Sequence, residues 1–142
     1  MAQAGSLLYL VVGAAFFGVA TSVAIAPAMW LALTFLLHGA RTMPVVTGLP
    51  ILWLALYVAL AIGQRGILPM SGPAYFVIVA LNTMVAALPF VVDRFGAPRL
   101  HGLASTLIFP AAWVAVEFLR SRFASAASWG SIAYTQYGYL PL

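Results

Sequence analysis

Hydrophobic residues in this chain fall into four long runs that shorter polar connections separate. The runs cover residues 6–37, 45–62, 74–92 and 103–119. An α-helix needs roughly 20 apolar residues to cross the hydrocarbon core of a bilayer, and each run comes close to or exceeds that length. The pattern therefore predicts an all-α protein, an integral membrane bundle of four to five transmembrane helices.

The first run is too long for one upright helix. Its 32 residues would extend about 48 Å at 1.5 Å per residue, against a hydrocarbon core of about 30 Å. Pro27 lies near its middle and disfavours helix at the residue before it. We predict a tight hairpin with spans near 6–25 and 28–40. A single tilted helix and a cleaved signal peptide are the alternatives, although no basic residues precede the run.

Polar and proline residues mark the remaining boundaries. Residues 93–99 form a charged connection after the third run. Pro110 either kinks the fourth helix or marks its effective start. Asn82 lies at the centre of the third run, and we expect it to form an interhelical hydrogen bond, with a ligand contact as the alternative.

The chain changes in character after residue 123. Residues 124–142 are rich in serine, glycine and aromatic residues, which is too polar for a helix deep in lipid. Aromatic rings with polar edges favour the boundary between membrane and water. We therefore predict two parts, a transmembrane bundle over 1–123 and an aromatic membrane-interface segment over 124–142.

Composition supports the membrane and excludes several classes of chemistry. Hydrophobic residues make up 65% of the chain and charged residues 6%, against about 25% charged in soluble domains. The net charge of +4 comes from arginines scattered between the runs, which argues against nucleic-acid binding. The chain contains no cysteine and no lysine, and His38 and His101 have no carboxylate cluster beside them. We predict no metal and no cofactor.

One stripe of the fourth run carries the most informative polar residues. Trp113, Glu117 and Arg120 are spaced at i, i+4 and i+7, which places all three on one helix face. A lone carboxylate at membrane depth costs several kcal/mol unless a partner satisfies it, and Arg120 has suitable spacing. Two interpretations stay open: a structural ion pair, or an ionisable group that lines a substrate path.

The same stripe carries a resemblance to a known family. Residues 110–120 have the pattern Pro-x-x-Trp-x-x-x-Glu-x-x-Arg, and Trp129 with Tyr134-Thr135-Gln136 follows. Together they resemble bacterial apolipoprotein N-acyltransferase. The family usually has proline before the later tryptophan, where this chain has Ser128.

The resemblance implies a multi-pass protein of the bacterial inner membrane whose nitrilase-like domain uses a Glu-Lys-Cys triad. That triad moves an acyl chain from a phospholipid to a lipidated apolipoprotein. Because this chain has no lysine or cysteine, we expect it to be the N-terminal membrane portion, inactive alone, with the catalytic domain in a further C-terminal region.

The predicted function is to anchor that domain and to line the access of lipid to it; a stand-alone bundle that serves as a transporter subunit or assembly partner is the alternative. The proposed lining residues come from both parts of the motif: Trp113, Glu117, Arg120, Trp129, Tyr134 and Gln136.

Overall fold

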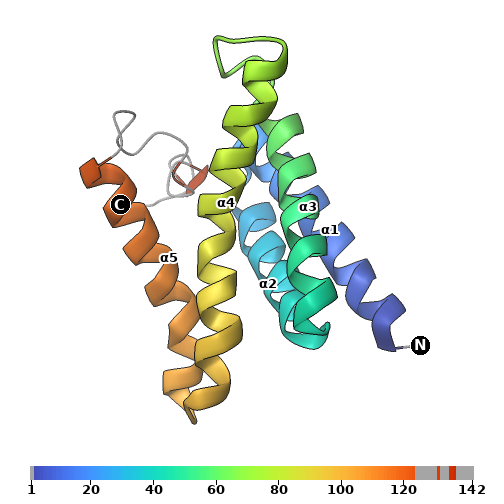
Figure 1. Cartoon of the computed structure of the whole chain (residues 1–142), viewed down its shortest axis with the longest axis vertical. Helices are drawn as coiled ribbons and strands as arrows, with labels where there is room; N and C mark the ends of the chain where they lie inside the picture. The colour runs from blue at the N-terminus through green and yellow to red at the C-terminus, as the bar shows by residue number, and fades with distance from the viewer. Residues whose placement is uncertain (1, 124–130, 132–134, 137–142) are drawn as a thin grey trace.

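The computed structural model describes residues 2–123, 131, 135 and 136. Within them the chain forms five α-helices and a short 3-10 turn, without a strand. The elements are α1 (Ala2–Val23), α2 (Ala26–Thr42), α3 (Val45–Gly63), α4 (Pro73–Gly96), η1 (Ala97–Arg99) and α5 (Leu103–Phe123). They pack as an up-and-down bundle (Figure 1), which confirms the predicted all-α membrane bundle.

Four of these helices are long and apolar enough to cross a membrane: Ala4–Val23, Val45–Gly63, the Pro73–Arg99 segment and Leu103–Phe123. The fifth, α2, has 17 residues and extends only about 26 Å at 1.5 Å per residue. That is slightly shorter than a hydrocarbon core of about 30 Å. The predicted number of spans is therefore four without α2 and five with it.

The predicted hairpin in the first run is confirmed, with a break at residues 24 and 25. Ala24 adopts a left-handed backbone conformation with φ of 55°, which reverses the chain direction in two residues. Pro27 lies in the first turn of α2, where its missing N–H would have no helical acceptor. Proline thus starts the second helix and does not interrupt a single long one.

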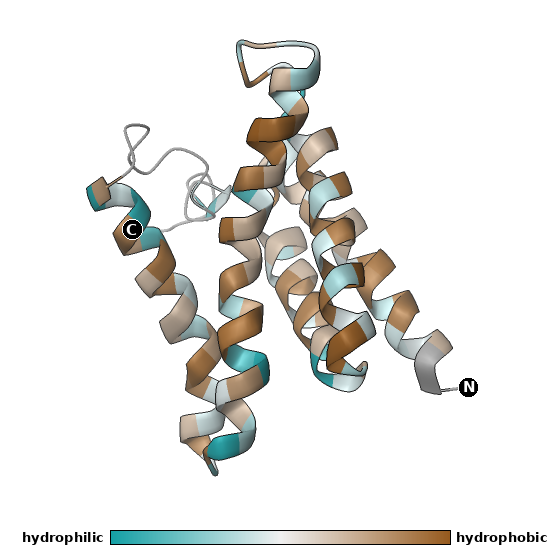
Figure 2. Ribbon diagram, viewed as in Figure 1, coloured by the Kyte–Doolittle hydropathy of each residue, from teal (hydrophilic) through white to brown (hydrophobic). Residues whose placement is uncertain are grey.

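The helices are apolar on both their inner and outer faces. On α3, Leu52 and Leu56 are fully buried, while Leu54 and Val58 are about half exposed. Figure 2 shows hydrophobic residues along most of the length of the helices. Such an exterior is suited to lipid, because hydrocarbon chains solvate it as well as the protein core does.

Close helix crossings hold α1, α2 and α3 together. A Cβ atom on Gly39 of α2 would lie 2.6 Å from the Leu10 side chain of α1. Only glycine lets the two backbones approach this closely, as small residues do in many membrane bundles.

Helix α5 is less deeply packed than the other helices. Among its described residues only Phe109 is buried.

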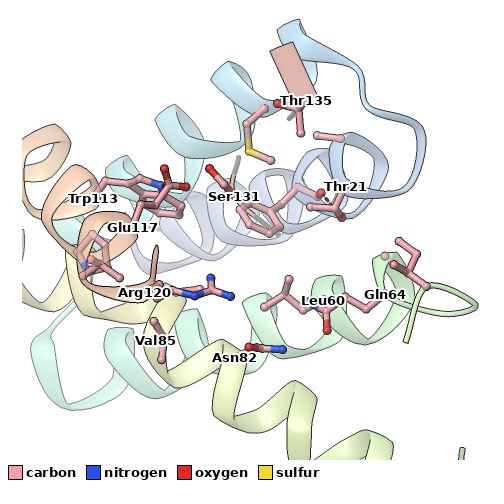
Figure 3. Close-up of a pocket in the computed structure, with 18 of the residues that line it drawn as sticks. Thr21, Leu60, Gln64, Asn82, Val85, Trp113, Glu117, Arg120, Ser131 and Thr135 are labelled. Carbon is pink, nitrogen blue, oxygen red and sulfur yellow. Dashed lines mark hydrogen bonds between the residues drawn. The ribbon is translucent and has the colours of Figure 1, made fainter. Parts of the chain in front are cut away.

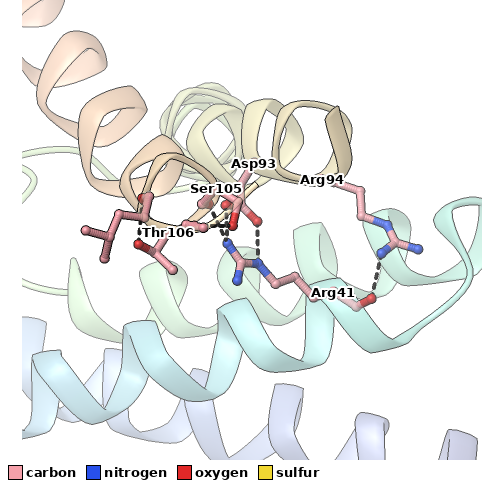
Figure 4. A network of polar contacts seen from close by, with 7 residues as sticks. Arg41, Asp93, Arg94, Ser105 and Thr106 are labelled. Atoms are coloured by element: carbon pink, nitrogen blue, oxygen red, sulfur yellow. Dashed lines mark hydrogen bonds and ion pairs between the residues drawn. The ribbon is translucent and has the colours of Figure 1, made fainter. Parts of the chain in front are cut away.

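The predicted charged connection after the third run is wrong in its first part. Residues 93–96 continue α4, and only residues 97–99 leave it as η1. Asp93 is 1% exposed and accepts hydrogen bonds from Arg41 Nε at 2.8 Å and Arg41 Nη2 at 2.6 Å (Figure 4). An ion pair with a different helix compensates the buried carboxylate, so the helix can continue through it.

Pro110 does not mark the start of the last helix. As predicted from the apolar run, α5 begins at Leu103, and it continues through Pro110 to Phe123. Proline residues also lie inside α3 and α4, at Pro50 and Pro89.

Candidate functional site

The polar stripe of α5 is anchored by aromatic packing against α4. Trp113 packs edge-on against Phe90 of α4, with ring centroids 6.1 Å apart, and against Phe109 at 5.6 Å. Its indole Nε1 donates a hydrogen bond of 3.1 Å to Glu117 Oε1, one turn further along the helix. The aromatic cluster therefore fixes the indole, and the indole orients the carboxylate.

A cavity of about 260 Å³ lies between this stripe and the rest of the bundle (Figure 3). Residues from all five helices line it, near the C-terminal ends of α1, α3 and α5. Most of the wall is apolar. Its polar members are Thr21, Gln64, Asn82, Trp113, Glu117, Arg120, Ser131 and Thr135.

Arg120 projects from α5 into the cavity, with Asn82 of α4 on the facing wall (Figure 3). Glu117 lies one turn before it on the same helix. The cavity thus holds both a permanent cation and a carboxyl group. Ionisable residues inside membrane bundles usually mark a functional path.

The wall opposite α5 offers hydrogen-bond acceptors to which no described residue donates. Gln64 Oε1 is buried and has no partner among the described residues. Thr21 uses its hydroxyl hydrogen for the helix carbonyls of Phe17 and Gly18, at 2.9 and 3.1 Å, so its lone pairs stay available. A buried acceptor without a donor costs about 1–3 kcal/mol, and a bound polar group would remove that cost.

Asn82 does not behave as predicted. Its side chain makes no interhelical hydrogen bond to any residue that the structure describes, and it lines the cavity instead. Its neighbour Thr83 is fully buried and donates 2.7 Å to Val79 O within α4. The alternative interpretation, a ligand contact, thus agrees better with the position of Asn82.

The proposed lining residues divide into three groups. Trp113, Glu117 and Arg120 all line the cavity. Gln136 does not line it: its Oε1 accepts 3.2 Å from Trp30 Nε1 of α2, and its Nε2 donates 2.9 Å to Thr135 Oγ1. Trp129 and Tyr134 lie outside the described residues.

Sequence reasoning missed four polar residues of the cavity wall: Thr21, Gln64, Ser131 and Thr135. Gln64 follows the last residue of α3 and resembles an ordinary helix terminator. Thr21 sits among small residues near the end of α1. No local pattern distinguishes either residue from a surface position, since only the packing of α1 against α3 and of α3 against α4 brings them to one cavity.

Among the described residues, no three His, Cys, Asp or Glu side chains gather where they could hold a metal ion. His38 instead makes an edge contact with the Tyr9 ring, 4.4 Å between centroids.

A family model matches residues 4–142, and it describes the apolipoprotein N-acyltransferase N-terminal domain. The matched range contains α2 to α5 completely and nearly all of α1. No curated protein and no solved structure gave a match.

Proposed function

Since the chain belongs to the apolipoprotein N-acyltransferase N-terminal domain family, we propose that its cavity admits the polar part of a phospholipid for acyl transfer. The chain is the membrane domain of such an enzyme and a multi-pass membrane protein. The proposal concerns what this domain contributes to the reaction: access for the lipid and a base for the catalytic domain.

The observation that carries the proposal is the mixed chemistry of the cavity wall. Apolar side chains such as Phe17, Met29 and Leu60 share it with Glu117 and Arg120. A phospholipid has the same two parts, an anionic phosphate and hydrocarbon chains. A guanidinium is well suited to phosphate, because its planar N–H groups can donate two hydrogen bonds to one phosphate.

The volume of the cavity supports the headgroup, and not the whole lipid, as its occupant. Pockets that enclose drug-sized ligands measure roughly 300–1,000 Å³, and this cavity has about 260 Å³. A phospholipid with two acyl chains is larger than such ligands. The headgroup therefore fits inside, while the acyl chains stay in the surrounding lipid.

The arrangement of α5 supports a lateral path for those chains. Among the described helices α5 packs against α4 and η1, and Arg41 of α2 reaches it near its start. It does not contact α1, so the side of the cavity between α5 and α1 has no contact between these two helices. Apolar side chains of α5 also face outward: Val114 is 66% exposed and Phe118 is 62% exposed. Acyl chains can pack against them without leaving the bilayer.

We further propose that residues 1–123 anchor a nitrilase-like catalytic domain at the cavity end of the bundle, with residues 124–142 as the connection. The family is one of enzymes that acylate apolipoproteins. By the resemblance of the motif on α5, the acceptor is a lipidated apolipoprotein and the membrane is the bacterial inner membrane. Lipid held near Arg120 would lie at the end of α5 that leads toward such a domain.

Arg120→Ala tests the headgroup site directly. The chain is reconstituted in nanodiscs with a phospholipid that carries a photoactivatable group near its phosphate, and labelled peptides are identified by mass spectrometry. Loss of a hydrogen bond to a charged group costs about 1.5–3 kcal/mol, which is roughly tenfold or more in affinity. We expect labelling of α5 to fall by about that factor.

Arg122→Ala is the matched control, since Arg122 lies two residues later on the same helix, is exposed and does not line the cavity. It should leave labelling unchanged. In the protein that carries the catalytic domain, Glu117→Gln and Arg120→Ala should impair acyl transfer without loss of membrane insertion. Equal labelling of Arg120→Ala and Arg122→Ala would overturn the proposal. Full acyl-transfer activity of Glu117→Gln and Arg120→Ala would overturn it as well.

A further inference from the structure

The last helix packs against α4 through its first half. Its packing lies in the half that follows η1, where Phe109 contacts Phe90 with ring centroids 4.8 Å apart. A Cβ atom on Gly96 of α4 would lie 3.0 Å from Ile108 Cδ1, so the two helices are in close contact there. The half that carries Glu117 and Arg120 borders the cavity instead of a neighbouring helix. Figure 1 shows α5 beside α4 near η1 and leaning away from the bundle toward Phe123.

A polar cluster ties this closed end to the rest of the bundle. Arg41 at the end of α2 binds both carboxylate oxygens of Asp93 and reaches the Ser105 carbonyl of α5 at 3.4 Å. Arg94 donates to the carbonyl oxygens of Arg41 and Met43. Figure 4 shows the Arg41 guanidinium directed at Asp93 and at the start of α5. One guanidinium thus connects three helices.

We propose that the Arg41–Asp93 pair is a positioning device that sets the tilt of α5 and thereby the width of the cavity. Asp93 is 1% exposed, so its carboxylate needs this partner and the contact cannot be exchanged for water at low cost. The pair lies at the opposite end of α5 from Arg120 and does not touch the cavity. Its importance for lipid access rests on the function proposed above.

The geometry of α5 turns a small tilt into a large displacement. Ser105 and Arg122 are 17 residues apart, which is about 26 Å along a helix at 1.5 Å per residue. A tilt of about 10°, within the scatter of helix crossing angles, moves the far end by about 4 Å. That displacement is comparable with a hydrogen-bond length, which is enough to separate Arg120 from a bound headgroup.

Distances between spin labels test the tilt, because the chain has no cysteine of its own. Arg65→Cys and Arg122→Cys place labels on exposed positions, one residue after Gln64 and two residues after Arg120 of the cavity wall. Ser22→Cys with Arg65→Cys gives a reference distance within the α1–α3 part of the bundle. Both pairs are measured by pulsed electron paramagnetic resonance on the full chain in nanodiscs, with and without Asp93→Asn.

We expect Asp93→Asn to shift or broaden the 65–122 distance by about 4 Å and to leave the 22–65 distance unchanged. Arg41→Lys, which keeps the charge but loses the two-point contact, should give a smaller shift. An unchanged 65–122 distance would overturn the positioning role. A change in both distances would overturn it too, since the pair would then support the whole bundle. No phospholipid probe enters these measurements, so their failure would leave the headgroup site to be judged by photolabelling.

Discussion

Replacing Gly63 with alanine adds one methyl group where α3 crosses α1 at the edge of the cavity. The new Cβ would meet the Thr21 hydroxyl and would lie 3.2 Å from Thr21 Cβ and 3.6 Å from the Gly18 carbonyl oxygen. Thr21 is β-branched, and its hydroxyl is held by the carbonyls of Phe17 and Gly18. The methyl group therefore requires either a helix shift or rotation of Thr21.

The cost follows from these contacts. Overpacking a close interface costs about 1–3 kcal/mol, and loss of the Thr21 hydrogen bond about 1 kcal/mol. Alanine returns up to about 1 kcal/mol because it favours the helix more than glycine does. We expect Gly63→Ala to lower the free energy of unfolding by about 1–2 kcal/mol and to narrow the cavity beside Gln64.

Unfolding in mixed micelles of a mild detergent and dodecyl sulfate, followed by circular dichroism, measures this change. Gly5→Ala is the control, because a Cβ at Gly5 of α1 meets nothing within 4 Å; it should be neutral or slightly stabilising. Thr21→Ala should remove most of the penalty of Gly63→Ala, as two residues in direct contact are energetically coupled. The reasoning is refuted if Gly63→Ala unfolds like the wild type, or if Thr21→Ala leaves its penalty intact.

Two further substitutions separate single hydrogen bonds from packing. Trp113→Phe should keep the aromatic contacts with α4 but remove the 3.1 Å hydrogen bond to Glu117. We expect photolabelling of α5 to weaken roughly 2- to 10-fold. Unchanged labelling would mean that the indole does not orient the carboxylate. Tyr75→Phe removes the 2.6 Å bond to the Ala61 carbonyl, which lies in the last turn of α3, where carbonyls lack helical donors. It should lower the free energy of unfolding by about 1 kcal/mol in the same micelle assay, and no change would show that water caps this carbonyl.

The stripe of α5 shows how far sequence reasoning extends into the site. Trp113 and Glu117 were predicted to share a face from their spacing alone, and the structure joins them by a hydrogen bond. The resemblance that this stripe carried is confirmed by the family match over residues 4–142. The lipid-lining role of the stripe stays a prediction that photolabelling will test.

Other parts of the site depended on partners far away in the chain. The charged residues that begin at Asp93 predict a connection, yet Arg41, 52 residues earlier, pairs with Asp93 and lets the helix continue through it. Gln64 had the appearance of a helix terminator, yet its Oε1 is buried at the cavity wall. The sequence around Asp93 does not indicate that Arg41 pairs with it, and the sequence around Gln64 does not indicate a cavity.

The sequence by itself determined that this chain is a membrane bundle and where its first hydrophobic run breaks. Span length follows from the thickness of the hydrocarbon core, and proline at residue 27 marks the hairpin, so both are local properties. The tertiary structure alone decided which faces meet, which residues line the cavity and which charges pair. In a soluble protein an amphipathic pattern would reveal the buried face. In this bundle lipid and core are both apolar, so buried Leu52 and exposed Leu54 are the same residue type, and the sequence does not distinguish them.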